Sequence, residues 1–198
     1  NLNTRLKMKI LITDIDDTLL DWSKRFDIFA RKHFDYNGIA LSKKPQRLWD
    51  ALNTTKENIP EFMKAHNESS EFAQLEYLND SEILNNVFDK FDKIIGLTSC
   101  GDTPIVKTLR QNNLKKLFPE LTEVIYLPFL AQKDEVLKEL ASQYNDAEIY
   151  MIDDNIYDVA DALTLAMKAA AYNTPFHKPD EYIPVVNNMS EFFEKIVK

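Results

Sequence analysis

The sequence predicts an α/β protein whose core is a Rossmann-like, doubly wound parallel sheet, with an α-helical cap inserted after the first strand. Three observations favour this class: short apolar runs, helical segments that alternate with the later runs, and a long strand-free stretch behind the first run. Runs that are apolar on both faces suit the buried strands of a parallel sheet. Alternation of strand and helix is typical of doubly wound sheets. The runs span residues 8–15, 93–99, 123–129, 148–153 and 168–174.

The predicted core helices follow the later runs. Thr103 and Pro104 predict the start of the first helix, because proline is favoured near the first helical position. Lys133 begins the second helix, and Ile156 marks the third. Apolar side chains at helical spacing predict one buried face on each helix. They are Val106, Leu109, Leu114 and Leu117, then Val136, Leu137, Leu140, Ala141 and Tyr144, then Ile156, Val159, Ala160 and Leu163.

Residues 22–92 contain no strand-like run, and we expect them to form a helical cap on a core made of residues 8–21 and 93–198. Because the insert directly follows the first strand, it should lie above the carboxyl ends of the strands, where open α/β sheets bind ligands. We expect most of its aromatic side chains to pack within the insert. Its helical faces comprise Trp22, Phe26, Phe29, Ala30 and His33, then Ile83, Leu84, Val87, Phe88 and Phe91, and less regularly Leu48, Trp49, Leu52, Phe72, Leu75 and Leu78.

Composition bounds what the chain can bind. The formal net charge of −8 and the pI near 5.0 disfavour a nucleic-acid surface or an acidic membrane, since the long-range field would repel both. Any anionic substrate therefore needs a local cation. No run is long enough to span a membrane, no signal-peptide pattern is present, and Cys100 as the only cysteine allows no internal disulfide. We expect a soluble, cytoplasmic protein, in which residues 1–7 are a tag remnant or a cut from a longer chain.

Several polar side chains follow the predicted strands at the points where those strands end. In an open parallel sheet, the ends of strands one, two and four converge at one edge although they are far apart in the sequence. We therefore expect a constellation of carboxylates, a hydroxyl group and an ammonium group there. Its members are Asp14 and Asp16 after strand one, Thr98 and Ser99 at strand two, Asp153, Asp154 and Asp158 after strand four, and Lys133 on the same side.

The acidic members of this constellation indicate a metal site. Carboxylates this close repel one another, and their pKa values would rise unless a cation joined them. Oxygen ligands together with room for phosphate and water suit Mg²⁺ better than Ca²⁺. With Mg²⁺ and Lys133 in place, the pocket becomes locally cationic and can accept a phosphate despite the negative charge of the chain.

Four segments together resemble the ordered motifs of the haloacid dehalogenase (HAD) superfamily of phosphohydrolases. They are TDIDDTLL at residues 13–20, the strand that ends at Thr98, the helix that opens at Lys133, and IDDNIYD at residues 152–158. The resemblance covers the chain from Met8 nearly to its end, and the insert falls where that superfamily places a helical cap. Single motifs of this kind are weakly specific, whereas their correct order at strand ends is strongly so.

The resemblance implies a Mg²⁺-dependent phosphoric monoester hydrolase that works through an aspartyl-phosphate. Asp14 would be the nucleophile, and Asp16 would be the general acid and then the base. Thr98 would hydrogen-bond the phosphoryl oxygens, and Lys133 would offset the negative charge. The implied metal ligands are Asp14, the main-chain carbonyl of Asp16 and either Asp154 or Asp153, while Asp158 would support the metal shell or Lys133.

One departure from the pattern, and one residue that distinguishes subclasses within it, bear on the expected chemistry. Where many members have Gly-Asp, this chain has Asp153 and Asp154, which leaves open the acid that touches the metal; the three-residue gap to Asp158 favours Asp154. Asp16 also separates subclasses, because a halide leaves without a proton whereas the leaving oxygen of a phosphate ester needs one. The acid at this position therefore favours phosphate esters over carbon–halogen bonds.

The substrate stays open at this level. We expect a small phosphorylated metabolite, with a phosphoprotein phosphatase or a nucleotidase of the same superfamily as alternatives, and we make no prediction of oligomeric state. A non-catalytic module on the same scaffold is a further alternative, because fold does not guarantee activity. A receiver-like signalling module is disfavoured, because it needs its phosphoacceptor after the third strand, where this chain has LPFLAQ at residues 127–132. Ser99 is expected to cap the helix that follows it.

Overall fold

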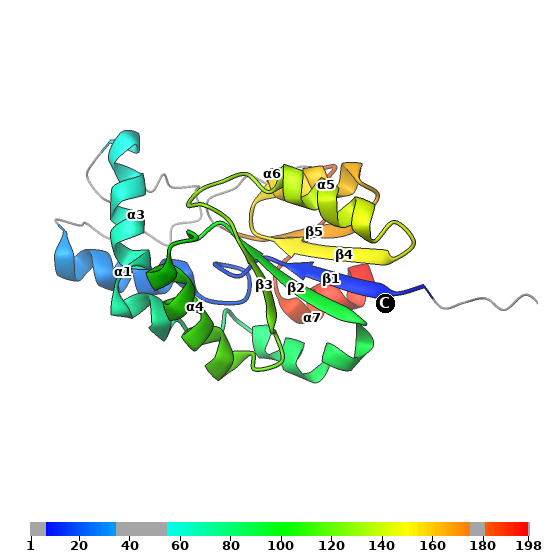
Figure 1. The fold of residues 1–198 in the computed structure, drawn as a ribbon, viewed down its shortest axis with the longest axis horizontal. Helices are drawn as coiled ribbons and strands as arrows, with labels where there is room; N and C mark the ends of the chain where they lie inside the picture. Colours follow the sequence, from blue (N-terminus) through cyan, green and yellow to red (C-terminus); the bar gives the residue numbers. More distant parts are fainter. Residues whose placement is uncertain (1–6, 35–54, 175–180, 198) are drawn as a thin grey trace, which may run out of the picture.

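The computed structural model describes residues 7–34, 55–174 and 181–197. Its centre is a six-stranded sheet in the order β3-β2-β1-β4-β5-β6, in which every neighbouring pair is parallel (Figure 1). The strands are β1 (Lys9–Thr13), β2 (Lys93–Thr98), β3 (Glu123–Tyr126), β4 (Glu148–Asp153), β5 (Lys168–Tyr172) and β6 (Val185–Val186). The predicted α/β class and all predicted strands are confirmed. Strand β6 was not predicted, because two residues are too short for a periodic signal.

The switch in strand order falls at β1. This strand pairs with β2 on one side and with β4 on the other, so that Thr13 lies opposite Gly96 and Ile152. The residues that directly follow β1 therefore lie between the carboxyl ends of β2 and β4. Open α/β sheets bind ligands at such a switch point.

Helices cover both faces of the sheet, as Figure 1 shows. On one face, α5 (Asp134–Gln143) and α6 (Ile156–Thr164) pack on a core that includes Ile10 and Ile12. On the other face, α4 (Pro104–Leu117) and α7 (Met189–Phe192), which runs on into a π-helical turn at Phe193–Val197, share a core that includes Leu11. Alternate residues of β1 thus enter opposite cores, as the pleat of a strand requires.

The predicted start of α4 is confirmed, including its N-terminal capping residue. Thr103 precedes the helix, its hydroxyl oxygen accepts a hydrogen bond from the backbone N–H of Val106 at 3.5 Å, and Pro104 occupies the first helical position. Proline costs nothing there, because the N–H that it lacks has no partner in the first turn of a helix. The other two predicted helices begin where expected, directly after Lys133 and at Ile156.

The described part of the insert is helical, but less regular than expected. It contains α1 (Trp22–His33), η1 (Lys56–Asn58), α3 (Ile59–Asn67), η2 (Ser70–Gln74), η3 (Ser81–Asn86) and η4 (Phe88–Lys90). For α1, the predicted burial of Trp22, Phe26, Phe29 and Ala30 is confirmed, whereas His33 is exposed and only its ring contacts that of Phe29. Leu48, Trp49 and Leu52 lie outside the described residues.

The α-helix predicted over residues 83–91 is wrong, since two short 3₁₀ turns, η3 and η4, occupy this stretch. The buried apolar residues of this stretch are Leu84, Val87 and Phe91, and Phe91 follows the last turn of η4 in extended backbone. Their spacing of three and then four residues is also that of an α-helical face, so the apolar pattern alone did not reveal the 3₁₀ turns. This end of the insert also contacts the core, because the carboxylate of Asp80 accepts hydrogen bonds from the backbone N–H groups of Met189 and Ser190.

A buried polar contact joins the insert to the core. The amide of Asn67, at the end of α3, donates to the carbonyl oxygen of Cys100 at 3.0 Å and accepts from the indole N–H of Trp22 at 2.8 Å. His66 packs against the rings of Trp22 and Phe26, and burial lowers the pKa of its imidazole to about 4. His66 is therefore a neutral packing residue at neutral pH.

None of the helices in the described ranges combines the length and the apolar composition that crossing a bilayer requires.

Candidate active site

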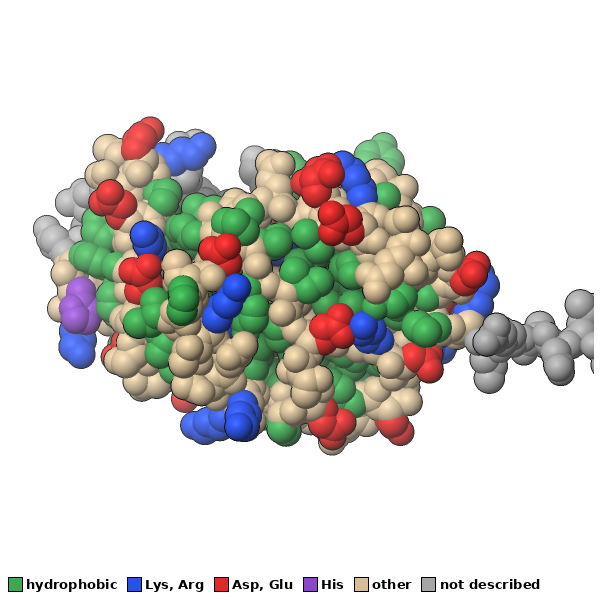
Figure 2. Space-filling model, viewed as in Figure 1, with side chains coloured by type: hydrophobic (Ala, Val, Ile, Leu, Met, Phe, Trp, Pro, Cys, Tyr) green, Lys and Arg blue, Asp and Glu red, His purple; other side chains and the backbone are tan. Residues whose placement is uncertain are grey.

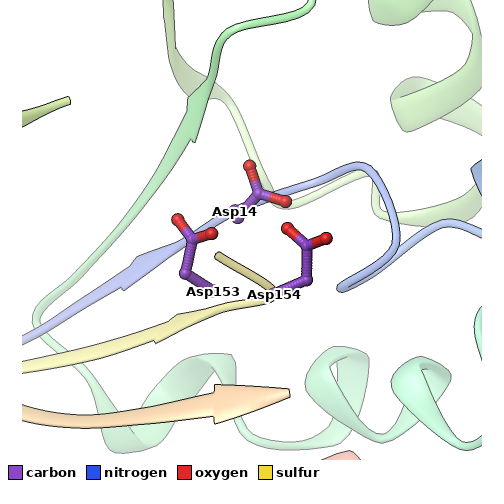
Figure 3. Close-up of side chains that lie close together, drawn as sticks. All are labelled: Asp14, Asp153 and Asp154. Atoms are coloured by element: carbon purple, nitrogen blue, oxygen red, sulfur yellow. The ribbon is translucent and has the colours of Figure 1, made fainter. Parts of the chain in front are cut away.

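Three carboxylates meet where β1 and β4 end. Asp14 directly follows β1, Asp153 is the last residue of β4, and Asp154 comes next. Oxygen atoms of the three lie within 4.8 Å of one another, and Figure 3 shows the side chains pointing toward one another. The sheet topology therefore brings together residues that the sequence separates by about 140 positions, as the strand ends predicted.

Lys133 neutralises part of this acidic cluster. Its ammonium group lies 2.6 Å from Oδ1 of Asp14 and 2.7 Å from Oδ2 of Asp153, and its side chain is only 5% exposed. Burial by itself would lower the pKa of Lys133, but the carboxylates of Asp14, Asp153 and Asp158 outweigh it and raise this pKa above its usual range. Lys133 is thus a permanent positive charge in the pocket, supplied by the loop that precedes α5.

Asp153 and Asp154 have different surroundings. Oδ2 of Asp153 accepts from Lys133, and Oδ1 accepts from the backbone N–H of Asn155 at 2.9 Å. The carboxylate of Asp154 has no hydrogen-bond or ion-pair partner among the described residues. Burial and the negative charges of Asp14 and Asp153 raise the pKa of Asp154 well above its ordinary value. Asp153 is therefore the partner of Lys133, and Asp154 is the carboxylate that lacks a cation.

This set of donors fits a magnesium ion. The unpaired carboxylate of Asp154 and the nearby carboxylate of Asp14 are hard oxygen ligands on one side of the cluster, and Mg²⁺ prefers one or two carboxylates together with substrate oxygens and water. Asp153, whose two oxygens are already engaged, fits a metal-binding role less well.

The site predicts an unusual pH dependence of stability in the metal-free protein. Burial raises the pKa of Asp153 to about 7 and that of Asp154 well above its ordinary value. Because these folded-state values exceed the unfolded value of about 3.9, the stabilising contribution of the two carboxyl groups is present at low pH and is lost as the pH rises through the folded-state pKa. In EDTA, the melting temperature should therefore be higher near pH 5.5 than near pH 8.

Magnesium should remove this loss. A ligand that binds only the native state at 100 times its dissociation constant stabilises by about 2.7 kcal/mol. Asp154→Asn should abolish most of the effect of magnesium on the melting temperature and reduce its dependence on pH, whereas Glu120→Gln, at an exposed acid beyond α4, should change neither. Equal melting curves for the wild-type protein in EDTA and in millimolar Mg²⁺ would contradict the metal assignment.

Asp158 supports the site from the first turn of α6. Its carboxylate lies 4.0 Å from the ammonium of Lys133 and accepts a hydrogen bond from the side-chain amide of Asn155 at 3.0 Å. Asn155 also caps α6, because its side-chain oxygen accepts from the N–H of Tyr157. Of the two supporting roles that the sequence left open, the geometry favours contact with Lys133.

Asp16 lies on the side of the site that faces β2 and α4. Its Oδ2 accepts a weak hydrogen bond from the hydroxyl of Thr98 at 3.4 Å, so the end of β2 is brought to the acid as the strand ends predicted. Burial raises the pKa of Asp16, and the neighbouring guanidinium of Arg110 opposes that rise. Asp14 and Asp16 therefore have different partners, Lys133 for the first and Arg110 for the second.

Sequence reasoning missed Arg110. This residue lies in α4, is fully buried, and forms an ion pair with Asp16. A signal was present, because the buried residues Val106, Arg110, Asn113 and Leu114 share one helical face and an arginine there needs a partner. The pattern that marked the inner face of the helix contained the arginine, but only the apolar positions were counted.

The capping role expected for Ser99 is wrong. Thr103 caps α4 instead, and the hydroxyl of Ser99 donates to the carbonyl oxygen of Ala131 at 2.7 Å. The backbone N–H of Leu130 in turn donates to the carbonyl oxygen of Ser99. Ser99 therefore links the end of β2 to the loop that carries Lys133.

Charged side chains on the outer surface are mixed in sign. On the face in Figure 2, the described Lys and Arg side chains are scattered among Asp and Glu and form no extended basic area. The ammonium of Lys133, by contrast, is buried in the acidic cluster. The local cation that an anionic substrate requires is thus part of the site itself.

Comparisons with known proteins support the class of fold. No family model matches the sequence, and no curated protein sequence matches it either. Among solved structures, a haloacid dehalogenase-like hydrolase from Bacteroides fragilis superposes with a TM-score of 0.61 at 15% identity, over 94% of this chain and 100% of that chain. A haloacid dehalogenase-like family hydrolase from Streptococcus pneumoniae gives 0.57 at 14% identity, over 84% and 85% of the two chains.

One similar structure contains a covalently bound small molecule. The L-2-haloacid dehalogenase from Xanthobacter autotrophicus, solved with chloropropionic acid covalently bound, gives a TM-score of 0.57 at 12% identity over 91% of this chain and 95% of that chain. The chain therefore has the haloacid dehalogenase-like hydrolase fold, as its motifs predicted. Structures of this fold include dehalogenases as well as other hydrolases, so the fold leaves the bond that is cleaved to be decided by the site.

Proposed function

We propose that this protein is a magnesium-dependent phosphatase that hydrolyses a small phosphate monoester through an aspartyl-phosphate at Asp14. The observation that carries the proposal is the presence, just after β1, of two acids with different contacts. Asp14 contacts the buried cation of Lys133, and the separate acid Asp16 lies beside the hydroxyl of Thr98. A nucleophile with a cation and a neighbouring proton donor is what cleavage of an ester with a basic leaving group needs.

The first half of the proposed reaction transfers the phosphoryl group to the protein. A carboxylate oxygen of Asp14 attacks phosphorus, and the bond between phosphorus and the ester oxygen breaks. Asp16 donates its proton to that departing oxygen, which leaves as an alcohol. Lys133 and the hydroxyl of Thr98 stabilise the negative charge that spreads over the phosphoryl oxygens in the transition state.

The second half regenerates the enzyme. Asp16, now ionised, removes a proton from water as the water oxygen attacks phosphorus, and the bond between phosphorus and the Asp14 oxygen breaks. Inorganic phosphate leaves, and Asp14 returns to its carboxylate form. One group thus serves both proton transfers.

The metal in this proposal would be held by Asp14 and Asp154 and by the main-chain carbonyl of Asp16. When bound, it supplies positive charge that offsets the repulsion between the phosphate and the carboxylates. The unpaired carboxylate of Asp154 supports this assignment over Asp153. Lys133 keeps Asp153 and Asp158 in place beside the metal ligands.

A haloacid dehalogenase is the second candidate, because dehalogenases are among the proteins with similar structures. Asp16 and Asp154 argue against it here, since a halide needs neither a proton donor nor a cation to offset phosphate charge. Phosphoproteins and nucleotides stay as alternative substrates of the proposed phosphatase, because the cap that would select the leaving group is only partly described.

A substrate panel tests the proposal. The purified protein should release phosphate from at least one small phosphate monoester in millimolar Mg²⁺ and should lose that activity in excess EDTA. Nucleotides and phosphopeptides in the same panel distinguish the alternative substrates. Release of chloride from 2-chloropropionate, or the absence of phosphate release from every ester, would show that the proposed reaction is wrong.

A further inference from the structure

Arg110 is a buried cation with a specific partner. Its side chain is 0% exposed, and it lies on the inner face of α4. In the part of the chain that the structure describes, Asp16 is the only carboxylate that forms an ion pair with it, through Nη2 of the arginine and Oδ1 of the acid. A buried charge is costly unless it is paired, so the guanidinium and this carboxylate hold each other in place.

The orientation of the guanidinium is fixed from a second direction. The centroid of the Phe72 ring, in η2 of the insert, lies 4.0 Å from the guanidinium carbon of Arg110. Stacking on an aromatic ring sets the plane of a guanidinium, and the rigid fork of donors then sets the direction of its hydrogen bonds. The cap residue Phe72 and the core residue Arg110 thus form one support behind Asp16.

The contacts of Asp16 divide between its two oxygen atoms. Oδ1 is bound by Arg110, whereas Oδ2 lies 3.4 Å from the hydroxyl of Thr98, on the side of the pocket where β2 ends. A carboxylate anchored at one oxygen by a charged donor has little freedom to rotate. The anchored geometry leaves Oδ2 as the oxygen directed toward the site.

We propose that Arg110 is a positioning residue for the proton transfers of Asp16. It fixes Oδ1, so that Oδ2 is held where it can give a proton to the departing ester oxygen and later take one from water. The inference rests on the proposed function, in which Asp16 is the acid and base. Misplacement of a catalytic group by about 1 Å can cost about 10²-fold in rate, so losing this anchor should be costly.

A double-mutant cycle in Arg110 and Asp16 tests the proposal. Arg110→Met keeps the length and apolar stem of the side chain but removes its charge. With an alkyl phosphate, whose leaving oxygen needs a proton, kcat should fall about 10²-fold with little change in KM. With p-nitrophenyl phosphate, the initial burst of product should be retained, because that leaving group scarcely needs a proton. Introduced into Asp16→Asn, the same change should cause no further loss, since its effect acts through the acid.

A merely structural role for Arg110 would give different results. It would lower the burst and the alkyl-phosphate rate together, and it would add to the effect of Asp16→Asn; either result would overturn the inference. Lys115→Met is the matched control, because it removes one positive charge from an exposed position of the same helix. Its rates and leaving-group dependence should equal those of the wild-type protein.

Arg110→Lys keeps the test decisive if Arg110→Met fails to fold. A lysine retains the charge but lacks the planar fork, so we expect partial rescue: a smaller loss with the alkyl phosphate and a retained burst. Unchanged alkyl-phosphate turnover in Arg110→Lys, with Arg110→Met unfolded, would overturn the positioning role. A wild-type protein that forms no acyl-phosphate would instead overturn the proposed function. Turnover at the wild-type rate in the Arg110 variants would overturn this inference alone.

Discussion

The Asp14→Asn variant is expected to form no acyl-phosphate and to release no phosphate from any ester. Asp14 is the carboxylate at the end of β1 that contacts Lys133, and its replacement by an amide removes the proposed nucleophile. The variant should fold, since the amide oxygen can still accept from Lys133. Acid-quenched protein incubated with labelled substrate should carry no label, and steady-state assays should show no turnover above background.

The Asp16→Asn variant distinguishes the proposed role of Asp16 from that of Asp14. It keeps the nucleophile and removes the group that donates and accepts protons, a contribution of about 10² to 10⁴ in rate for each proton transfer. With p-nitrophenyl phosphate, this variant should release about one equivalent of p-nitrophenol in a burst and then turn over slowly, because hydrolysis of the intermediate lacks its base. Label that maps to Ser99, Cys100 or a histidine, or turnover that persists in Asp14→Asn, would contradict the proposed mechanism.

Among the single substitutions proposed for the site, Lys133→Met should cause the largest loss in the free energy of unfolding. The ammonium of Lys133 contacts Asp14 and Asp153 and lies 4.0 Å from Asp158, and all four side chains are buried or nearly so. Removing one partner of a buried ion pair leaves charges without compensation, which costs about 3–5 kcal/mol. The carboxyl groups can escape part of this cost by protonation, so the loss should be smaller near pH 5.5 than near pH 8.

Chemical denaturation of Lys133→Met at the two pH values measures this effect. Lys138→Met, in the helix α5 that Lys133 directly precedes, is the matched control, because Lys138 forms exposed ion pairs with Asp134 and Glu135. Such surface pairs contribute little, so this control should unfold at nearly the same denaturant concentration as the wild-type protein. A pH-independent loss of stability in Lys133→Met would indicate that lost packing, and not uncompensated carboxylates, is responsible.

Much of the core was predictable because its signals are local. The apolar runs predicted β1 to β5, because a strand buried on both faces must be apolar along its length. Thr103 and Pro104 predicted the start of α4, because capping depends only on neighbouring residues. The insert was less predictable, because the apolar residues of 83–91 have the spacing of an α-helical face although the chain forms two 3₁₀ turns there.

The constellation was predictable in its members but not in its pairings. Strand ends placed Asp14, Asp153 and Asp154 at one edge, because parallel topology brings such ends together. The sequence left open which of Asp153 and Asp154 touches the metal, and only the spacing to Asp158 favoured Asp154. The tertiary structure separated them, because the loop before α5 directs Lys133 at Asp153 and leaves Asp154 unpaired.

The sequence by itself determined the α/β class, the polar residues that follow each strand and the acids that gather at the strand ends. Each of these depends on short patterns along the chain. Only the tertiary structure decided which cation each acid meets. Arg110 lies 94 residues from Asp16 in the sequence, and nothing in the local pattern of α4 predicts that its buried face turns toward that acid. Ion pairs between distant segments depend on how helices pack on the sheet, so a periodic pattern can predict a buried face but not the partner buried against it.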